Sequence, residues 1–265
     1  MVPPDGDLRL LPTLLLSTAL VGACKAPPLP HPAPPIQVAA AADLTLAFEE
    51  MGKLFEARTG NKVTFSFGAS GALAKQLGQG APFDLFAAAN TSFVDDAVKA
   101  GACDGATKAL YARGHVVVWT KKGGITLKAL RDLGNPEIKH IAIANPDHAP
   151  YGKAAREALM HAGLWPALES KIVRAENVRQ ALQFAQTGNA DAAIIALSLV
   201  AKDETGEKLA IEPALHAPIE QTLVVCKNGK NSDGARAFAQ LVESPDGQAL
   251  LRRYGFGGSG EQPGK

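Results

Sequence analysis

The sequence has few cysteines, no cluster of positive charge and no apolar run long enough to span a membrane. Its 265 residues include only three cysteines, Cys24, Cys103 and Cys226, too few and too scattered for a zinc site or a disulfide framework. The formal net charge is +1, so nothing in the charge pattern indicates a nucleic-acid partner. The chain does have 46% hydrophobic residues, enough for one large domain or for two lobes with separate cores.

The N-terminal segment, residues 1–23, is predicted to be a signal peptide of the lipoprotein type. Residues 8–24, LRLLPTLLLSTALVGAC, contain an apolar stretch too short to cross a bilayer, and small residues precede Cys24. The segment VGAC resembles a bacterial lipobox, in which cleavage leaves the cysteine as a lipidated N-terminus. Two aspartates and only one arginine precede the apolar stretch, which is a departure from such signals. An ordinary secretory signal with an incidental cysteine is the alternative.

Residues 24–35 are expected to form a tether without a fold of its own. Six prolines fall in KAPPLPHPAPP, residues 25–35. At about 3.1 Å per residue in polyproline II, this segment would hold a domain roughly 30 Å from a membrane. The globular part is expected to begin at Ile36, and residues 258–265, GSGEQPGK, are expected to be a disordered tail.

From Ile36 onward, patterns typical of strands and of helices alternate. Strands are expected at residues 36–41, 62–67, 83–89, 114–120, 140–144, 171–173, 191–195 and 221–226, and helices at residues 44–60, 72–80, 91–101, 127–133, 152–163, 178–188, 234–242 and 247–256. Residues 201–219 show no strong pattern. The alternation predicts an α/β fold with mainly parallel sheets, and the number of strand candidates favours two lobes over one open sheet.

Ser70 lies in FGASGAL, where a strand pattern gives way to a helical one. A hydrolase nucleophile would need a G-x-S-x-G turn, but Ala72 stands where the last glycine is required. The spacing of His115, His140 and His148 does not tie any of them to Ser70 as a catalytic base, so an enzyme is not expected. Ser70 is better explained as a donor at a helix N-terminus, where free N–H groups and the helix dipole favour an anion.

Three other predicted helices begin in the same way after a strand. Asp43, Tyr151 and the pair of Asn177 and Val178 lie at these helix starts. A site built from backbone N–H groups and hydroxyls can hold an anion without any cationic side chain. Asp and Asn are also favoured N-caps, so ordinary helix capping explains the same residues equally well.

Six motifs occur in a defined order along the chain: VAAAADL, FSFGASGALAKQL, GAPFDLFAAAN, IAIANPDHAPYGKAAREAL, AENVRQAL and RRYGF. In order and spacing they resemble the periplasmic molybdate-binding proteins of ABC importers, over nearly all of the folded chain. The resemblance implies a type II solute-binding protein, with two α/β lobes joined by two hinge strands and the oxyanion in the cleft between them. It implies a lobe 1 of residues 36–113 plus 219–257 and a lobe 2 of residues 114–218.

The resemblance also implies which residues bind the ligand. Carried over by position, they are Asp43, Ser70, Tyr151 and Val178, the last through its main-chain N–H, with Ala42, Gly71 and Ala196 as further candidates. Ala196 falls where several family members have a tyrosine that donates a hydrogen bond, and Tyr151 is a candidate to replace it. The metal would be bound as its oxyanion, with no residue coordinating it directly.

Asp43 falls where many members of that family have serine and others asparagine. A carboxylate about 4 Å from a dianion would cost several kcal/mol even at an effective dielectric of about 20. Three interpretations remain open. The side chain caps its own helix and points away, or it is protonated in the complex, or it accepts a hydrogen bond from a proton-bearing oxyanion such as hydrogen phosphate.

The function implied by the resemblance is binding of molybdate or tungstate and delivery to the membrane permease and ATPase of an ABC importer by closure of the lobes. The protein is expected to be a monomer without a cofactor, held at the membrane from the periplasmic or extracytoplasmic side by a lipid on Cys24. The alternatives are a binding protein for phosphate or arsenate, and a sensor or scaffold lipoprotein. Cys103 and Cys226 could pair in an oxidising compartment, although a cysteine in a strand is often only a small buried hydrophobe.

Overall fold

The computed structural model describes Met1 and residues 33–260. The predicted signal peptide, Cys24, the tether up to residue 32 and the end of the tail from residue 261 lie outside the described residues. A compact unit begins at Ala33 and contains both sheets of the protein. In the described part of the chain, no helix is both long and apolar enough to cross a membrane.

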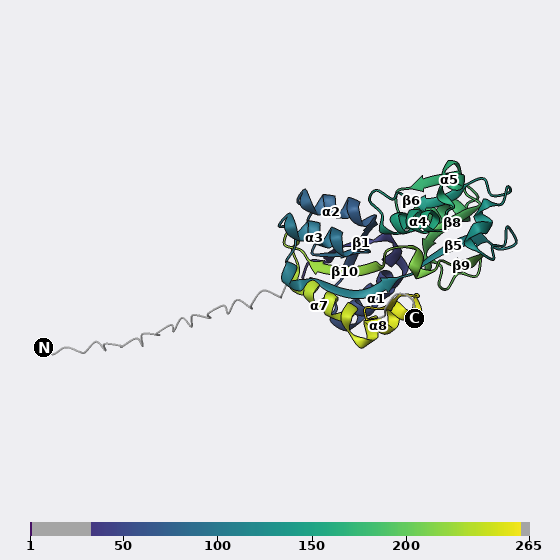
Figure 1. The fold of residues 1–265 in the computed structure, drawn as a ribbon. Helices are drawn as coiled ribbons and strands as arrows, with labels where there is room; N and C mark the ends of the chain where they lie inside the picture. Colours follow the sequence, from purple (N-terminus) through teal and green to yellow (C-terminus); the bar gives the residue numbers. More distant parts are fainter. Residues whose placement is uncertain (2–32, 261–265) are drawn as a thin grey trace. The chain divides into compact units, whose positions relative to one another are not determined.

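The first sheet has six strands in the order β11-β4-β10-β3-β1-β2. Figure 1 labels two of them, β1 and β10. These are β1 (Ile36–Ala41), β2 (Val63–Gly68), β3 (Leu85–Ala88), β4 (Ala109–Gly114), β10 (Ile219–Val225) and β11 (Gly257–Gly258). The helices that accompany it are η1 (Ala42–Leu44), α1 (Thr45–Thr59), α2 (Ser70–Gly78), α3 (Thr91–Lys99), η2 (Gly105–Thr107), α7 (Ser232–Glu243) and α8 (Pro245–Arg253). We call this sheet with its helices lobe 1.

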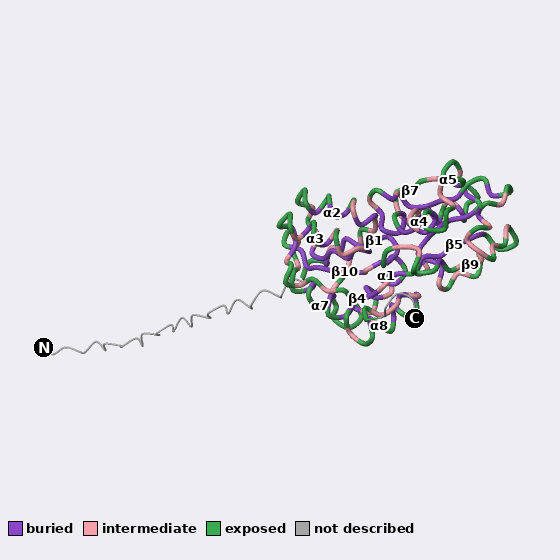
Figure 2. Tube along the Cα trace, viewed as in Figure 1, coloured by how far each residue is buried: buried purple, intermediate pink, exposed green. Residues whose placement is uncertain are grey.

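Both faces of the first sheet are covered, and successive side chains along each strand point to opposite faces. Ala39 and Phe86 belong to a cluster with the apolar residues of α2 and α3. Val38 and Leu85 belong to the main core with the phenylalanines of α1 and α7. The central strands β1 and β3 are therefore buried almost throughout, which explains their continuous apolar sequence. Figure 2 labels β1 among the buried segments.

The second sheet has five strands in the order β7-β6-β8-β5-β9. These are β5 (Val116–Lys121), β6 (Ile141–Ala144), β7 (Ile172–Ala175), β8 (Ala192–Ala196) and β9 (Gly206–Ala210). The helices that accompany it are η3 (Leu130–Gly134), α4 (Pro150–His161), α5 (Trp165–Leu168), η4 (Glu169–Lys171), α6 (Val178–Gln186), η5 (Leu197–Leu199) and η6 (Pro213–Leu215). We call this sheet with its helices lobe 2, and the predicted two-lobed α/β fold is confirmed.

The chain passes between the lobes twice. β4 leads into β5 with only His115 between them, and β9 leads back to β10. The expectation of mainly parallel sheets is wrong, because only the pairs β1–β2, β1–β3, β6–β7 and β6–β8 are parallel. All pairings of β4, β5, β9 and β10 are antiparallel. The strands that enter and leave a lobe at the same hinge must run in opposite directions, which makes both sheets mixed.

Several local elements differ from the sequence-based expectations. The strand β4 occupies residues 109–114, where no strand was expected. Residues 201–219 contain the edge strand β9, whose residues are half-buried or exposed and so lack an apolar pattern. The helix expected at residues 127–133 is only the short turn η3, because the Asp132 carboxylate accepts the backbone N–H groups of Lys128 and Ala129 and closes a local turn. Gly258, expected in the tail, instead pairs with β4 as part of β11.

Cys103 and Cys226 form a disulfide. Cys103 follows α3 and Cys226 follows β10, and an antiparallel bridge holds their backbones face to face. Both side chains are buried in lobe 1, among the residues that pack beneath α2 and α3. The sequence left open whether these two cysteines pair. The pairing of two distant segments decides that they do.

Candidate functional site

A small cavity lies between the two lobes, where the parallel strands end. Its empty volume is about 200 Å³, including its mouth. Its walls are residues 41–43, 68–70 and 89 of lobe 1 and residues 149–151 and 177–178 of lobe 2. Each of these segments lies at or after the carboxyl end of β1, β2, β3, β6 or β7. Open α/β sheets bind ligands at this edge, because the turns and helix N-termini after parallel strands meet there.

The cavity wall contains hydrogen-bond donors and small apolar groups but no cationic side chain. None of its twelve residues is Lys, Arg or His, and Asp43 is the one acidic residue among them. In the part of the chain that the structure describes, no group of three or more His, Cys, Asp or Glu residues could hold a metal ion. The wall therefore suits an anion that is held by neutral donors.

Backbone N–H groups reach the cavity from helix starts. Ser70 is the first residue of α2 and Val178 the first of α6, and Tyr151 is the second of α4. The N–H groups of such residues have no acceptor within their own helix. At α6 the Asn177 side chain accepts the next two N–H groups, of Arg179 and Gln180, at 3.1 and 3.0 Å. Asn177 therefore caps the helix and leaves the N–H of Val178 for a ligand.

Ser70 is fully buried, and its hydroxyl is oriented by a backbone contact. Its Oγ accepts the N–H of Ala89, which follows β3, at 3.0 Å. A serine oxygen that accepts one hydrogen bond keeps its own hydrogen for donation. An oriented hydroxyl with a hydrogen left to donate therefore lies at the cavity wall.

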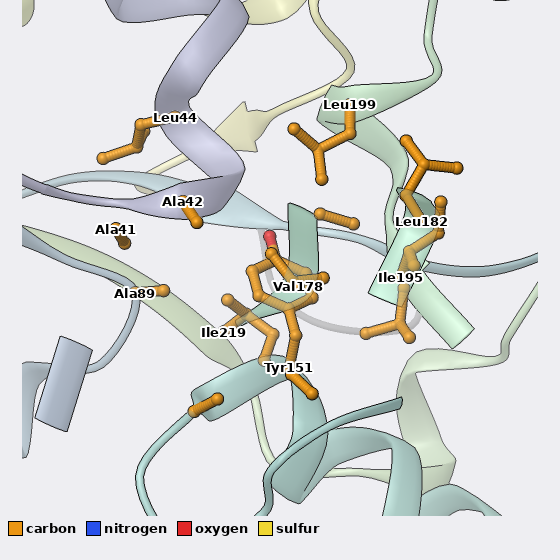
Figure 3. Packing of buried hydrophobic residues seen from close by; sticks show 14 of the residues in the cluster. Ala41, Ala42, Leu44, Ala89, Tyr151, Val178, Leu182, Ile195, Leu199 and Ile219 are labelled. Carbon is orange, nitrogen blue, oxygen red and sulfur yellow. The ribbon is translucent and has the colours of Figure 1, made fainter. Parts of the chain in front are cut away.

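Tyr151 brings a hydroxyl from lobe 2 to the base of the cavity. Figure 3 shows its ring beside Val178, with Ala42 and Ala89 of lobe 1 close by, and all four residues line the same cavity. The Tyr151 hydroxyl packs against Gly114 at the end of β4, so closely that a Cβ there would collide with it. Burial raises the pKa of Tyr151 well above its usual value, so this hydroxyl stays neutral and keeps a proton to donate.

Asp43 is 1% exposed and lies in η1, directly after β1. Its carboxyl does not cap the helix, so that interpretation is wrong. Instead Oδ2 accepts the side-chain amide of Gln221, in β10, at 2.5 Å, and Oδ1 has no hydrogen-bond partner. Burial raises the pKa of Asp43 from 3.8 to about 7, although contacts with Tyr151 and Gln221 oppose the shift. Two interpretations remain open. Asp43 is protonated in the complex, or it accepts a hydrogen bond from a proton-bearing oxyanion.

The further candidates separate into one that lines the cavity and two that do not. Ala42 belongs to the cavity wall. Gly71 is absent from it, because its N–H donates across the lobes to the carbonyl of His148 at 3.0 Å. Ala196 ends β8 and pairs with Val116 near the hinge, away from the wall.

Sequence reasoning missed two residues that shape this site. Ala89 supplies the N–H that orients Ser70, and nothing about an alanine in a sequence reveals such a role. Gln221 holds Asp43, and a signal was available, since it is a long polar residue at the start of the mainly apolar stretch QTLVVC. A polar residue that is buried in a strand normally has a partner.

The protein has two α/β lobes between which the chain crosses twice, and helix starts of both lobes line the cavity between them. These features define the two-lobed class of ligand-binding proteins. Residues 36–257 match the family model described as bacterial extracellular solute-binding protein, and the chain belongs to this family. The matched segment contains every residue of the cavity wall and all of both sheets except Gly258, the last residue of β11.

Three relatives agree with this assignment. The molybdate-binding protein ModA of Rhodobacter capsulatus is 35% identical over 234 residues, covering 86% of this chain and 90% of that protein. The putative ABC transporter substrate-binding lipoprotein YvgL of Bacillus subtilis is 32% identical, covering 83% and 85%. Among solved structures, the periplasmic molybdate-binding protein of Azotobacter vinelandii matches with a TM-score of 0.79 at 29% identity, covering 83% of this chain and 98% of that one.

Proposed function

We propose that this protein binds molybdate or tungstate outside the cytoplasm and delivers it to the permease and ATPase of an ABC importer. The observation that carries the proposal is the cation-free cavity whose donors come from helix starts of both lobes. Near neutral pH these dianions offer only acceptor oxygens, which suit a wall of N–H and O–H donors. The relatives named as molybdate-binding proteins support this choice of anion.

The proposed mechanism is closure of the lobes around the anion. Ser70 would contact the anion from lobe 1, and Tyr151 and the N–H of Val178 would contact it from lobe 2, with Asp43 and Ala42 at the base. An anion that bridges both lobes binds the closed state more tightly than the open one, so it shifts the population toward closure. The two crossings, β4 to β5 and β9 to β10, would act as the hinge.

The proposal includes a location and an anchor. A disulfide between Cys103 and Cys226 suits an oxidising compartment such as the periplasm. Attachment of a lipid at Cys24, which lies outside the described residues, is part of the proposal and is supported by the name of the Bacillus relative. Replacing Cys24 by Ala should move the protein from the membrane fraction to the soluble extracytoplasmic fraction, and an unchanged distribution would refute the anchor.

A second candidate ligand is a proton-bearing oxyanion such as hydrogen phosphate or hydrogen arsenate. The observation that favours it is Asp43 Oδ1, a buried acceptor without a donor at the cavity wall. An ionised carboxylate there could accept the proton of such an anion, which molybdate does not carry at neutral pH.

Thermal unfolding and calorimetry with molybdate, tungstate, sulfate, phosphate and arsenate would test the function. A ligand at about 100 times its Kd should add about 2.7 kcal/mol to stability, which raises Tm by a few degrees in a domain of this size. We expect molybdate and tungstate to do so. Stabilisation by phosphate or arsenate alone would favour the second candidate, and no binding of any oxyanion would refute the function.

A further inference from the structure

A cluster of unpartnered polar atoms lies where the cavity meets the hinge. It consists of Asp43, Tyr111 of β4, Tyr151 of α4 and Gln221 of β10, each at most 2% exposed. Asp43 Oδ1, Gln221 Oε1 and both tyrosine hydroxyls have no hydrogen-bond partner among the described residues. An unpartnered buried polar atom destabilises the folded protein, so stability alone does not explain such a group.

The groups around the Asp43 carboxyl include no cation. Gln221 donates one N–H to it, and the titratable side chains that interact with it are Tyr151 and Tyr111. From η5, Ser198 donates to the Asp43 backbone carbonyl and not to the carboxyl. Buried carboxylates that stay ionised normally have a cation among their partners. Asp43 has only neutral ones, namely the Gln221 amide, the nearby Tyr151 hydroxyl and its own backbone N–H, and burial still outweighs their effect on its pKa.

The charged or titratable groups on neighbouring segments have other partners or lie elsewhere. Arg113 of β4 and Glu220 of β10 pair with each other at 3.7 Å. Arg179 of α6 is exposed to solvent. His148, in the loop before α4, lies against Gly71. None of them contributes to the shifted pKa of Asp43, whose largest cause is burial.

A dianion in this cavity would therefore meet either an ionised or a neutral Asp43. The ionised form would repel it, because like charges this close repel each other even at an effective dielectric of about 20. The neutral acid removes that repulsion and adds an O–H donor to the cluster. A bound anion raises the affinity of Asp43 for a proton. By linkage, protonation of Asp43 raises the affinity of the site for the anion by the same factor.

We propose that Asp43 is the specificity-determining residue of the site and that it holds a proton whenever the oxyanion is bound. Where the free carboxyl is ionised, each dianion is then taken up together with one proton from solvent, which bonds to Asp43. The neutral acid accepts fully deprotonated oxyanions, and the ionised form excludes them. This inference rests on the proposed function, because it concerns the same anion site.

Calorimetric titration with molybdate in two buffers of different ionisation enthalpy measures the proton directly. At about pH 8.5, uptake should approach one proton per anion, and at about pH 6 it should be much smaller because the carboxyl is already protonated. The Kd should rise up to about tenfold per pH unit above the pKa of the free carboxyl. These measurements on the unaltered protein do not depend on any variant folding.

Asp43→Asn keeps the shape of the side chain without the charge. It should bind molybdate at both pH values and take up almost no proton, and it should lose the pH dependence of Kd. Asp96→Asn, on the exposed side of α3, is the matched control and should behave like the unaltered protein. Both variants keep His148, so a pH dependence that comes from this histidine would remain in Asp43→Asn.

Molybdate binding without proton uptake at about pH 8.5 would overturn the inference and leave the proposed function intact. The inference also fails if Asp43→Asn takes up as many protons as the unaltered protein. Preference for phosphate that disappears in Asp43→Asn would overturn it as well, because Asp43 would then act as an ionised acceptor. Failure to bind any oxyanion across the pH range would refute the function and the inference together.

Discussion

The backbone N–H of Gly71 in lobe 1 donates to the backbone carbonyl of His148 in lobe 2, at 3.0 Å. There is no room for a side chain between them, since a Cβ on Gly71 would lie 2.9 Å from the His148 oxygen and 2.9 Å from a ring carbon of Phe93. A direct bond between the lobes at the start of α2 exists only while they are together. In the proposed closure this bond would help to hold the lobes together, and Gly71 is absent from the cavity wall.

Gly71→Ala should weaken closure and, with it, ligand binding. The added methyl forces the lobes apart at α2, and a loss of about 1.4 kcal/mol in the closed state raises Kd about tenfold. Calorimetry measures the change. Gly78→Ala in the same helix is the control, because its nearest neighbour is the Ala100 Cβ at 3.8 Å. Equal affinities in the two variants would contradict the role of Gly71.

Ser70→Ala should lower affinity for the oxyanion by about 10- to 100-fold, because a hydrogen bond to a charged group contributes about 1.5–3 kcal/mol. It should also lower the free energy of unfolding by about 1–3 kcal/mol, since the buried N–H of Ala89 loses its acceptor. Ligand titration and urea unfolding separate the two effects. Ser66→Ala, exposed in β2, should change neither, and an unchanged affinity in Ser70→Ala would remove Ser70 from the site.

Loss of the Cys103–Cys226 disulfide should destabilise lobe 1. The bond joins residues 123 positions apart, and removal of a native disulfide typically costs about 2–5 kcal/mol. Urea unfolding of Cys103→Ala, Cys226→Ala and the double variant should give nearly equal losses, since each breaks the same bond. Additive losses would show that the two cysteines contribute separately through packing. Mass spectrometry without reductant checks the bond itself.

Asp43 should make the stability of the ligand-free protein fall as the pH rises. Its pKa is about 7 in the folded protein against 3.8 without burial, so between these values the folded state binds more protons than the unfolded state. Its contribution to stability is complete below about pH 4 and is lost as the pH rises through about 7. Between about pH 5 and about pH 8, the unaltered protein should lose stability relative to Asp43→Asn, on the order of a few kcal/mol. Urea unfolding at both pH values measures this, and an unchanged difference would contradict the raised pKa.

The sequence by itself determined the alternation of strands and helices, because periodicity of apolar residues is a local property. It also determined where the donors lie, since a helix that follows a strand necessarily exposes its first N–H groups at the strand's end. Ser70, Tyr151 and Val178 could therefore be proposed from their positions at helix starts. Motif resemblance added the class of ligand, which spacing alone did not provide.

Only the tertiary structure decided which distant residues meet. Asp43 and Gln221 are 178 positions apart. Their contact, with Tyr151 and Tyr111 beside it, excluded the helix-cap interpretation of Asp43 and left the two that involve a proton. The contact of Gly71 with His148, the pairing of Cys103 with Cys226 and the edge strand β9 were decided in the same way. The physical reason is that burial, side-chain direction and strand pairing depend on how the lobes pack around the hinge, and no local pattern encodes that packing.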